Sequence, residues 1–389
     1  MPPLIRALAE KEDKNMPDII LKNVTKMYGK NAAVDHLNLV IPDHSFITLL
    51  GPSGCGKTTT LRMIAGLETP TSGEISINGE LVYSSEKGID IPPEKRNVGF
   101  LFQNYALWPH MTVYQNITFG LDNLHWPKDK MAAKAEQLMK MLKISEYKDR
   151  YPSELSGGQQ QRVAIARTLS TGPKTLFMDE PLSNLDAKLR MEMRTELKRL
   201  HMETDSTFIY VTHDQLEAMT LSTKICLIKE GKLQQYAAPL TVYNEPANTF
   251  VADFIGNPSI NLLTVKAGST VGDTTELECG TLRLKFAAKE KPDKSSQTPA
   301  PGKEYILGIR PENIGISAEG KIKAKIYSTL PSGMETVVKL KIDDLFLTSV
   351  VFGSVDFKVN EEVGVEIKSD KNIVFSKEEG HDLAVGEIE

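Results

Sequence analysis

The chain has 389 residues, which is too long for one compact core and predicts two or three domains. Hydrophobic residues make up 40% and charged residues 25% of the chain, a globular composition that excludes a disordered or fibrous protein. The formal net charge of -5 does not favour nucleic acid as the main partner, and no apolar run approaches the ~18 to 20 residues that a membrane span needs.

The start of the chain and its cysteines indicate where the protein is found. The first residues combine a short apolar patch with charges, and they lack the apolar core and the cleavage site of a signal peptide. We expect residues 1–15 to be a disordered extension without function. Cys55, Cys226 and Cys279 are too few and too scattered for a disulfide framework or a zinc site, which fits a reducing cytoplasm.

Strand-like and helix-like segments alternate from about residue 18 to residue 250. A short apolar run, "FITLLG" at 46–51, leads into a glycine-rich loop, and the segment after the loop has helical spacing. The runs "KTLFMDE" at 174–180 and "TFIYVTH" at 207–213 are typical of buried parallel strands whose C-terminal ends carry chemistry. The pattern predicts an α/β domain at 16–250 with a mainly parallel sheet.

The pattern changes in the middle of this domain and again after it. The helical segment "MAAKAEQLMKMLKI" at 131–144 has no strand nearby, and we expect a helical insert over about residues 104–168. After about residue 260 the strands are short and alternating, and a Pro/Ser/Lys-rich loop at 289–304 interrupts them. Residues 251–389 are therefore expected to form a separate β-rich domain, a small barrel or sandwich.

The segment "GPSGCGKTT", residues 51–59, fits the phosphate-binding pattern G-x-x-x-x-G-K-[ST]. Glycines let the backbone wrap around phosphates, Lys57 places a positive charge at the outer phosphates, and the Thr58 hydroxyl can bind Mg²⁺. The pattern arises by chance in on the order of one chain in a hundred of this length. Here it follows a predicted strand and opens a predicted helix, as the mechanism requires.

Two acidic residues end the predicted strand in "LFMDE". Asp179 suits indirect coordination of Mg²⁺, and Glu180 directly after it can polarise an attacking water. Taken alone, such a pair is better explained as the solvated end of a strand. Beside a phosphate loop, the catalytic interpretation is favoured.

Three further residues each have a second explanation on chemistry alone. Gln103 ends a strand-like segment and its amide can reach a metal or water, but a surface glutamine in a loop explains it equally well. His213 ends another strand, where an imidazole can donate to a γ-phosphate, although a lone histidine there is more often structural. Tyr28 offers a ring on which adenine can stack, although a tyrosine before a glycine turn is usually a core residue.

These residues, in this order, resemble the ATP-binding-cassette (ABC) ATPases. The resemblance covers residues 18 to about 250, and "LSGGQ" at 155–159, in register with the other motifs, is highly specific. The lysine, glutamate and histidine most often lost in inactive copies are all present. The resemblance implies an ATP site made of the following residues: Tyr28, Gly51, Pro52, Ser53, Gly54, Cys55, Gly56, Lys57, Thr58, Thr59, Ser156, Gly157, Gly158, Gln159 and Asp186.

The resemblance also explains why one chain carries a second anion site, the glycines of "LSGGQ" before a predicted helix. In such ATPases two nucleotide-binding domains pair head to tail, and the signature of one closes over the ATP held by the phosphate loop of the other. The residues at 156–159 then belong to the partner's nucleotide, and Asp186 lies at the seam. A chain with one copy of each motif must dimerise, most simply with itself.

The mechanism implied by the resemblance is hydrolysis of ATP by a positioned water. Glu180 acts as the base, Lys57 and Mg²⁺ offset charge on the phosphates, and His213 holds the γ-phosphate together with the signature serine of the other protomer. The expected catalytic residues are Glu180, His213, Gln103 and Lys57, and the expected Mg²⁺ ligands are Thr58, Gln103 and Asp179.

The flanking sequence resembles the ATPase subunits of bacterial and archaeal importers for sugars and related solutes. This narrower resemblance rests mainly on "VYNEPANTFVADFIGNPSINLL" at 242–263 and on "LGIRPENI" at 307–314. It implies that residues 251–389 form an OB-like regulatory or dimerisation domain. Two alternatives stay open: the client is a polyamine, iron or oxyanion importer, or the last domain is an unrelated β-domain that stabilises the dimer.

The same resemblance implies partners. Two transmembrane permease subunits and an extracytoplasmic solute-binding protein complete the transporter and hold the homodimer at the cytoplasmic face of the membrane. A permease helix would occupy the groove beside "YALWPHMT" at 105–112, with Trp108 and Met111 as contacts, unless both simply pack the helical insert. A regulatory protein at the C-terminal domain is a further expected partner, and nucleic acid is not.

Overall fold

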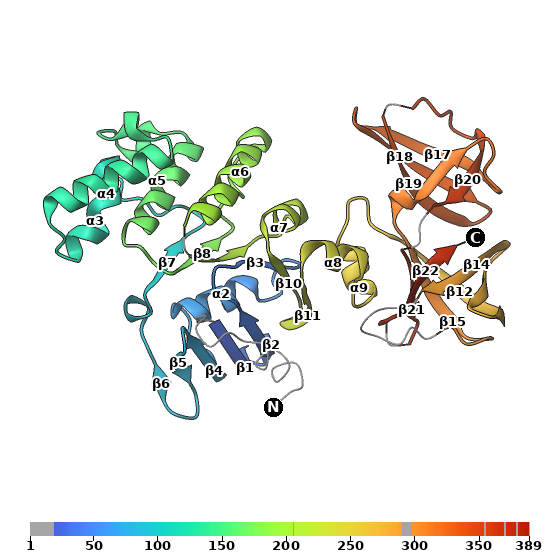
Figure 1. Ribbon diagram of the computed structural model, residues 1–389, viewed down its shortest axis with the longest axis horizontal. Coiled ribbons are helices and arrows are strands. Elements are labelled where there is room, and N and C mark those ends of the chain that lie inside the picture. Colours follow the sequence, from blue (N-terminus) through green and yellow to red (C-terminus); the bar gives the residue numbers. More distant parts are fainter. Residues whose placement is uncertain are drawn as a thin grey trace. The chain divides into compact units, whose positions relative to one another are not determined.

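The computed structural model describes residues 19–204, 206–289, 298–353, 355–368, 371–378 and 380–388. The extension expected at residues 1–15 lies outside the described residues, as does half of the loop expected at 289–304. The chain divides into two compact units, the first ending at Pro239 and the second beginning at Leu240 (Figure 1). The boundary expected at residue 250 falls inside a helix of the second unit.

The first unit is built on a six-stranded sheet. Its strands, in sheet order, are β11 (Lys232–Ala237), β10 (Lys224–Lys229), β3 (Phe46–Leu50), β9 (Thr207–Val211), β8 (Thr175–Asp179) and β7 (Val98–Leu101). All neighbours pair in parallel except β11, which is antiparallel to β10. Every side chain of β3, β8 and β9 is buried, and their sequences are therefore continuous apolar runs. The predicted, mainly parallel α/β sheet is confirmed.

A second sheet of this unit is antiparallel and was not predicted from the sequence. Its strands, in sheet order, are β2 (Asn31–Ile41), β1 (Ile19–Tyr28), β4 (Ser72–Ile77), β5 (Glu80–Ser84) and β6 (Ile89–Asp90). The pairing of β1 with β2 shifts register three times along its length. Such bulges interrupt the alternation of buried and exposed side chains, and that alternation is the signal by which an antiparallel strand is recognised.

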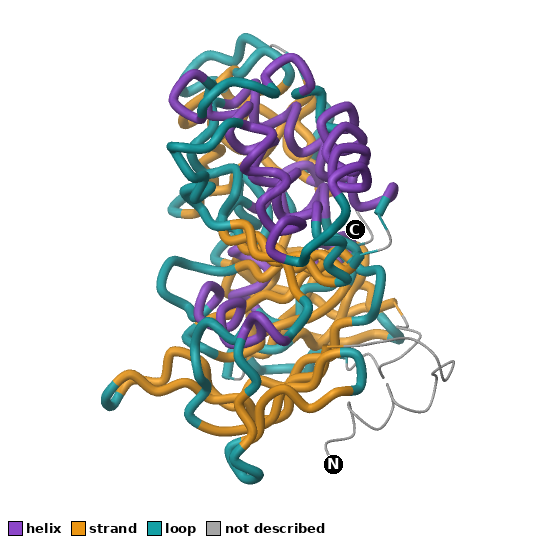
Figure 2. Tube along the Cα trace, turned by 90° about the vertical axis from the view of Figure 1, so that its left-hand side faces the viewer, coloured by secondary structure: helices purple, strands orange, loops and turns teal. Residues whose placement is uncertain are grey.

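Six α-helices and three short 3₁₀ helices complete the described part of the first unit. They are α2 (Lys57–Ala65), η1 (Pro93–Lys95), α3 (Val113–Asn123), α4 (Lys128–Met141), η2 (Ser145–Tyr147), η3 (Pro152–Glu154), α5 (Gly157–Ser170), α6 (Ala187–Glu203) and α7 (Gln215–Leu221). Helices α3, α4 and α5 pack on one another, whereas α2 packs on β8 and β9 (Figures 1 and 2). The helices between 113 and 170 thus form a group of their own, in which α5 contacts β7, the edge strand of the parallel sheet.

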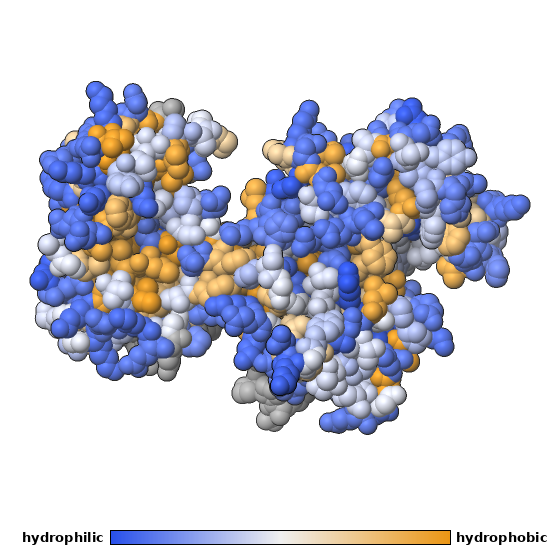
Figure 3. Space-filling view, turned by 180° about the vertical axis from the view of Figure 1, so that it is seen from behind, coloured by the Kyte–Doolittle hydropathy of each residue, from blue (hydrophilic) through white to orange (hydrophobic). Residues whose placement is uncertain are grey.

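No described helix is long and apolar enough to cross a membrane. The face seen in Figure 3 is mostly hydrophilic, and its hydrophobic residues gather in separate patches.

The second unit contains a closed barrel and a five-stranded sheet. The barrel strands, in order, are β12 (Asn261–Val271), β13 (Thr274–Cys279), β14 (Leu282–Lys289), β22 (Asp382–Ile388), β21 (Asn372–Ser376) and β15 (Glu304–Ile309). The sheet strands are β16 (Ile314–Ser317), β20 (Glu362–Ile367), β17 (Ile322–Pro331), β18 (Glu335–Ile342) and β19 (Leu345–Phe352). Buried and exposed residues alternate along β12 and β14, so one face of each strand lines a shared core. The predicted all-β C-terminal region is confirmed.

Arg310 joins the two segments on which the resemblance to sugar importers rests. Its guanidinium is buried and donates to the backbone oxygens of Tyr243 (2.7 Å), Ala252 (3.0 Å) and Ile255 (2.5 Å). It also lies over the ring of Tyr243 at 4.0 Å, while the Tyr243 hydroxyl donates to Glu312 at 2.6 Å. Burial lowers the pKa of Arg310, so the three carbonyls are what satisfy the buried cation. The motif around Arg310 therefore fastens α8 (Pro239–Asn244) and α9 (Thr249–Phe254) to the β-strands of their own unit.

We expect Arg310→Met to lower the free energy of unfolding of the second unit by about 3 kcal/mol, because it leaves buried carbonyls without donors. Chemical denaturation of the full chain, followed by circular dichroism, measures this. The matched control is Arg283→Met, because Arg283 forms an exposed ion pair with Glu278 on the same barrel and its loss should change stability little. Equal effects of both substitutions would show that Arg310 does not fasten the helices.

Candidate functional site

The phosphate loop connects the end of β3 to the start of α2 and requires glycine at two places. Gly51 and Gly56 have φ of 150° and 100°, values that other residues rarely adopt. A Cβ atom on Gly51 would lie 2.1 Å from the backbone oxygen of Ile228, and one on Gly56 would lie 2.2 Å from that of Ala33. The loop can therefore pack only with bare backbone, and its N–H groups together with the N-terminus of α2 form a nest for phosphate.

Lys57 is buried at the centre of this loop. Its ammonium donates to the backbone oxygens of Gly51 and Pro52, each at 2.8 Å. Cys55 is also buried, with its sulfur 3.8 Å from the Lys57 nitrogen, and burial raises the pKa of its thiol. Lys57 thus holds a positive charge at a fixed position beneath the phosphate loop. Cys55 takes part in the loop through its backbone rather than through its thiol.

Thr58 and Asp179 lie side by side, as the sequence analysis requires of two ligands of one ion. The Thr58 hydroxyl donates to the carboxylate of Asp179 at 2.9 Å, and the Arg62 guanidinium lies 3.5 Å from the other carboxylate oxygen. Burial raises the pKa of Asp179, while the contacts from Thr58 and Arg62 lower it. Hydroxyl and carboxylate oxygens are ligands that suit Mg²⁺ when phosphate oxygens supply the rest.

Glu180 and His213 also come together, from the ends of two neighbouring parallel strands. The Nδ1 atom of His213 lies 3.2 Å from a carboxylate oxygen of Glu180, and the Glu180 N–H donates to the backbone oxygen of Val211 at 3.1 Å. Glu180 has a φ of 44°, a left-handed conformation that costs a glutamate about 1 kcal/mol or more. The strained residue is thus the one whose carboxylate faces the His213 imidazole.

Gln103 contacts the turn after Glu180 rather than the Thr58–Asp179 pair. Its amide nitrogen donates to the hydroxyl of Ser183 at 3.3 Å, and the Asn184 side chain donates to the Gln103 backbone oxygen at 3.3 Å. The Ser183 hydroxyl in turn donates to the backbone oxygen of Glu180 at 2.9 Å. The Gln103 amide oxygen is left for other ligands, and the residue is tied to the turn that contains Asp186.

The "LSGGQ" residues form the N-terminus of α5. Ser156 accepts a hydrogen bond from the Gln159 N–H at 3.4 Å, and the Gln159 side chain accepts one from the Ser156 N–H at 2.8 Å, a capping box. A Cβ on Gly157 would meet nothing nearer than Leu185 at 3.8 Å. These contacts leave room for a side chain at residue 157. Packing within one chain therefore does not explain why this residue is a glycine.

Tyr28 is half exposed at the end of β1, which excludes the core interpretation of this residue. The ammonium of Lys26 lies 5.1 Å from the centre of the Tyr28 ring. The exposed ring is suited to stacking on a ligand base.

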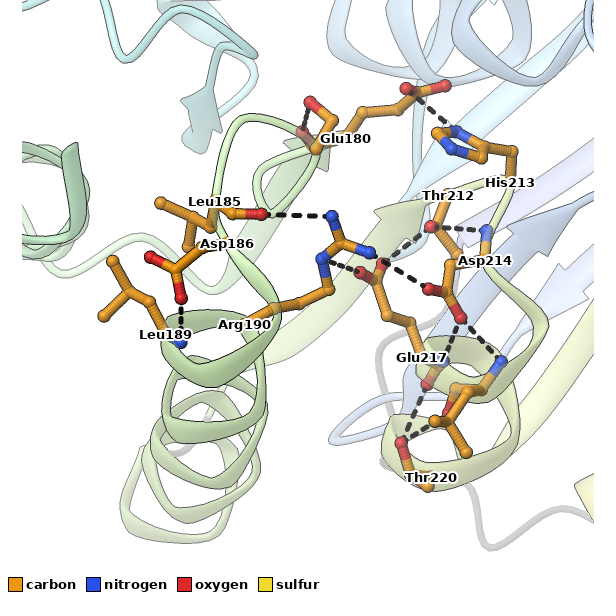
Figure 4. A network of polar contacts seen from close by, with 12 residues as sticks. Glu180, Leu185, Asp186, Leu189, Arg190, Thr212, His213, Asp214, Glu217 and Thr220 are labelled. Atoms are coloured by element: carbon orange, nitrogen blue, oxygen red, sulfur yellow. Dashed lines mark hydrogen bonds and ion pairs between the residues drawn. The ribbon is translucent and has the colours of Figure 1, made fainter. Parts of the chain in front are cut away.

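A polar network beside the site was not predicted from the sequence. It joins Arg190 on α6 to Asp214 and Glu217, which follow His213 at the start of α7 (Figure 4). Asp214 accepts hydrogen bonds from the N–H groups of Leu216 and Glu217 and so caps α7. The sequence signals are weak: Arg190 stands four residues after Asp186 and Glu217 four after His213, spacings that occur in many helices.

A groove of about 410 Å³ lies beside the segment that follows Gln103. Its lining residues include Phe100, Phe102, Trp108, Phe119, Arg167 and Thr171. The Trp108 ring is 4.2 Å from that of Phe119, and the Arg167 guanidinium lies over Trp108 at 4.7 Å. Trp108 therefore lines an open groove while it packs against the helical insert, and Met111 is partly buried next to it.

Comparison with known proteins gives one family and several long matches. The model of the family described as ABC transporter matches residues 34–183. The trehalose/maltose import ATP-binding protein MalK of Thermococcus litoralis is 42% identical over 375 residues, which is 94% of this chain and 99% of that protein. The oligosaccharides import ATP-binding protein MsmX of Bacillus subtilis is 41% identical over 93% of this chain and 98% of its own length. The spermidine/putrescine import ATP-binding protein PotA of Rubrobacter xylanophilus is 43% identical over 87% of each chain.

Two solved structures each match more than half of the chain. One is a dimeric post-hydrolysis state of the ATP-binding cassette MJ0796 bound to ADP and Pi; it has a TM-score of 0.50 and 32% identity, covering 57% of this chain and 98% of that chain. The other is cbiO1 from Clostridium perfringens, part of the ABC transporter complex cbiONQ, with a TM-score of 0.54, 29% identity and 58% and 90% coverage.

Proposed function

Since the chain belongs to the ATP-binding proteins of ABC transporters, whose activity is ATP hydrolysis coupled to transport, we propose that it powers the import of sugars through a membrane permease. The observation that carries the proposal is the length of the match to a trehalose/maltose import protein, 94% of this chain and 99% of that protein. A match to the cassette alone would fit any transporter of the family. This one includes the β-rich second unit, with its Arg310 motif.

In the proposed ATP site, the triphosphate occupies the nest at 51–56 and the adenine lies against Tyr28. Lys57 exchanges the carbonyls it now contacts for phosphate oxygens. Thr58 and Asp179, already in contact, would hold Mg²⁺ together with the Gln103 amide oxygen. When bound, the ion would offset negative charge on the phosphates.

In the proposed reaction, Glu180 accepts a proton from the attacking water as its oxygen bonds to the γ-phosphorus, while the bond from that phosphorus to the bridging oxygen breaks and ADP leaves. His213 donates a hydrogen bond to the γ-phosphate, and the 3.2 Å contact with Glu180 orients its ring. Both groups sit at the carboxyl ends of parallel strands, next to the phosphate nest, where α/β sheets bind ligands. The left-handed backbone at Glu180 aims the carboxylate in this direction.

In the proposed assembly, two copies pair head to tail, so that Ser156, Gly157, Gly158 and Gln159 bind the nucleotide of the partner. The support is that Gly157 has room for a side chain within its own chain, and that the similar MJ0796 structure is dimeric. A helix N-terminus with bare glycines is suited to a phosphate brought by another molecule. The complete site is therefore shared between two chains, and Asp186 lies where they meet.

The groove at Trp108 is the proposed contact with the permease. It is lined by aromatic side chains and one arginine, which suits a helix with an apolar face and a terminal carbonyl or carboxylate. Its lining includes Phe102, the residue before Gln103, and the Gln103 amide donates to Ser183 in the turn after Glu180. Movement of the bound helix would thus displace Phe102 and Gln103 and, through the contact of Gln103 with Ser183, the turn after Glu180.

A second candidate function is polyamine import, with the same chemistry and a different permease. The observation that favours it is the 43% identity with a spermidine/putrescine import protein, over 87% of both chains. The ATPase does not contact the transported solute in either case, so the two candidates differ only in the complex to which the chain belongs.

The test is to recover the complex. A tagged Glu180→Gln variant, with ATP, is used to capture partners from detergent-solubilised membranes, and mass spectrometry identifies them. We expect two multi-span permease subunits beside a sugar-type binding protein. A polyamine system in their place would favour the second candidate, and a soluble regulator alone would overturn the transport assignment.

Trp108→Ala is the companion variant for the groove. It should reduce recovery of the permease while ATP binding stays at the wild-type level, because the groove is separate from the phosphate nest. The control is Trp126→Ala, which removes the other tryptophan of the chain, a partly exposed residue between α3 and α4. Equal recovery with both variants would place the permease elsewhere.

A further inference from the structure

Arg190 contacts three groups with three different nitrogens. Its Nη2 donates to the backbone oxygen of Leu185 at 3.1 Å, its Nη1 lies 3.6 Å from the Asp214 carboxylate, and its Nε lies 4.0 Å from the carboxylate of Glu217. Figure 4 shows the guanidinium between the turn at Asp186 on one side and the start of α7 on the other. One side chain thus spans two segments that are far apart in the sequence.

On the first side, Arg190 belongs to the turn that carries Asp186. The Asp186 carboxylate caps α6 by accepting from the Leu189 N–H at 2.9 Å, and its backbone oxygen accepts from the Arg190 N–H at 2.8 Å. The Arg190 side chain then folds back onto Leu185, the residue before Asp186. The backbone on both sides of Asp186 is therefore held by the first turn of α6.

On the second side, Arg190 reaches the residues that flank His213. The Thr212 hydroxyl donates to Glu217 at 2.6 Å and accepts from the Asp214 N–H at 3.0 Å. Tyr210 also donates to Glu217, at 2.8 Å. His213 stands between two residues whose positions the network fixes, and its ring faces Glu180.

Arg190 offsets the negative charge of the Asp214 and Glu217 carboxylates. Glu217 is buried, and burial raises the pKa of its carboxyl, as does the nearby Asp214. Hydrogen bonds from Thr212 and Tyr210 and the charge of Arg190 lower that pKa. Without Arg190 two carboxylates would face each other with only neutral donors beside them, so the start of α7 would rearrange.

We propose that Arg190 is a positioning residue that couples the Asp186 turn to His213 and thereby links the seam between protomers to the residue that meets the γ-phosphate. This inference rests on the proposed function, which gives Asp186 and His213 their roles. A displacement of the Asp186 turn moves Leu185 and the Arg190 guanidinium bonded to it. The guanidinium then displaces Asp214 directly and Thr212 through Glu217. Arginine is suited to this because its planar fork holds several acceptors at once, which a lysine ammonium on a flexible stem does not.

The first variant is Arg190→Met, compared with Arg194→Met one turn further along α6. We expect Arg190→Met to lower kcat for ATP hydrolysis between about tenfold and a hundredfold, as for a misplaced catalytic group, with KM within about twofold. Arg194→Met should keep the wild-type kcat. The ring signals of His213 in the NMR spectrum, assigned with His213→Ala, should shift in Arg190→Met although the two side chains are not in contact.

The second variant removes the charges that face Arg190 and keeps the shape of the network. In Asp214→Asn with Glu217→Gln, asparagine can still cap α7 and the glutamine oxygen can still accept from Thr212 and Tyr210. It should show the same fall in kcat and the same shift of the His213 signals. This variant carries the test if Arg190→Met does not fold.

A wild-type kcat in the folded variants, or unmoved His213 signals, would overturn the coupling role. Glu180→Gln in the same assay separates this outcome from a failure of the proposed function. If Glu180→Gln turns over at the wild-type rate, the catalytic assignment itself is wrong. If it is inactive while the Arg190 and Asp214/Glu217 variants are normal, only the coupling through Arg190 is excluded.

Discussion

Glu180→Gln is expected to bind ATP as the wild-type chain does and to hydrolyse it about 10²–10³-fold more slowly, the loss typical of removing one stabilising group from such a site. Glutamine has nearly the same shape and keeps an oxygen for the contact with His213, but its amide does not accept a proton from water at neutral pH. The phosphate nest, Lys57 and Asp179 are unchanged, so affinity should be unchanged. Binding of a fluorescent ATP analogue and steady-state release of phosphate measure the two quantities.

The matched control is Glu230→Gln. Glu230 is an exposed glutamate in the turn between β10 and β11, and its φ of 50° is close to that of Glu180. Glu230→Gln makes the same chemical change at a similar backbone conformation outside the site, so hydrolysis should stay at the wild-type rate. Rapid multiple turnover by Glu180→Gln would remove Glu180 from the mechanism, whatever the control shows.

Gly157→Asp should leave the folding of the single chain unchanged and abolish ATP-dependent dimerisation, and with it ATP hydrolysis. An aspartate in the first turn of α5 stabilises the helix through its dipole, and a Cβ at this position lies 3.8 Å or more from its neighbours. In the proposed dimer the same carboxylate would face the partner's triphosphate. Repulsion between like charges a few ångströms apart, in a site that excludes water, amounts to several kcal/mol.

We expect this variant, combined with Glu180→Gln, to bind ATP but to show no ATP-dependent dimer in sedimentation experiments. With Glu180 restored, hydrolysis should fall at least about a hundredfold, the rate equivalent of such repulsion. Lys128→Asp places an aspartate at the same position of α4, the first residue of the helix, and should dimerise normally. A normal dimer from Gly157→Asp would mean that the "LSGGQ" residues do not bind a partner's nucleotide.

The parallel sheet and the residues at its edge could be predicted because each signal is local. A fully buried strand such as β8 is a continuous apolar run, and Asp179 and Glu180 follow directly from its end. The parallel order then brings Glu180 next to His213, since the ends of β8 and β9 share an edge. The contact of Thr58 with Asp179 follows in the same way.

The antiparallel sheet and the arginine contacts could not be predicted because their causes are distant in sequence. The register of β1 depends on bulges that the partner strands impose, and these remove the alternation that would have revealed it. Arg310 lies 67 residues from the carbonyl of Tyr243, and nothing in either segment shows that one buries the other. Arg190 likewise has an ordinary place on a charged helix, and its two carboxylate partners are known only once α6 and α7 pack together.

The contacts of Arg310 also decide where the chain can be cut. A fragment ending at residue 250, the boundary expected from sequence, would cut through α9 and keep α8 without the guanidinium that donates to the carbonyl of Tyr243. A fragment ending at Pro239 keeps every strand of the parallel sheet and none of the residues that Arg310 contacts. Recombinant cassettes and chimaeras with exchanged C-terminal modules should therefore be joined at this proline, because Arg310 and the carbonyls that it contacts then stay in the same half.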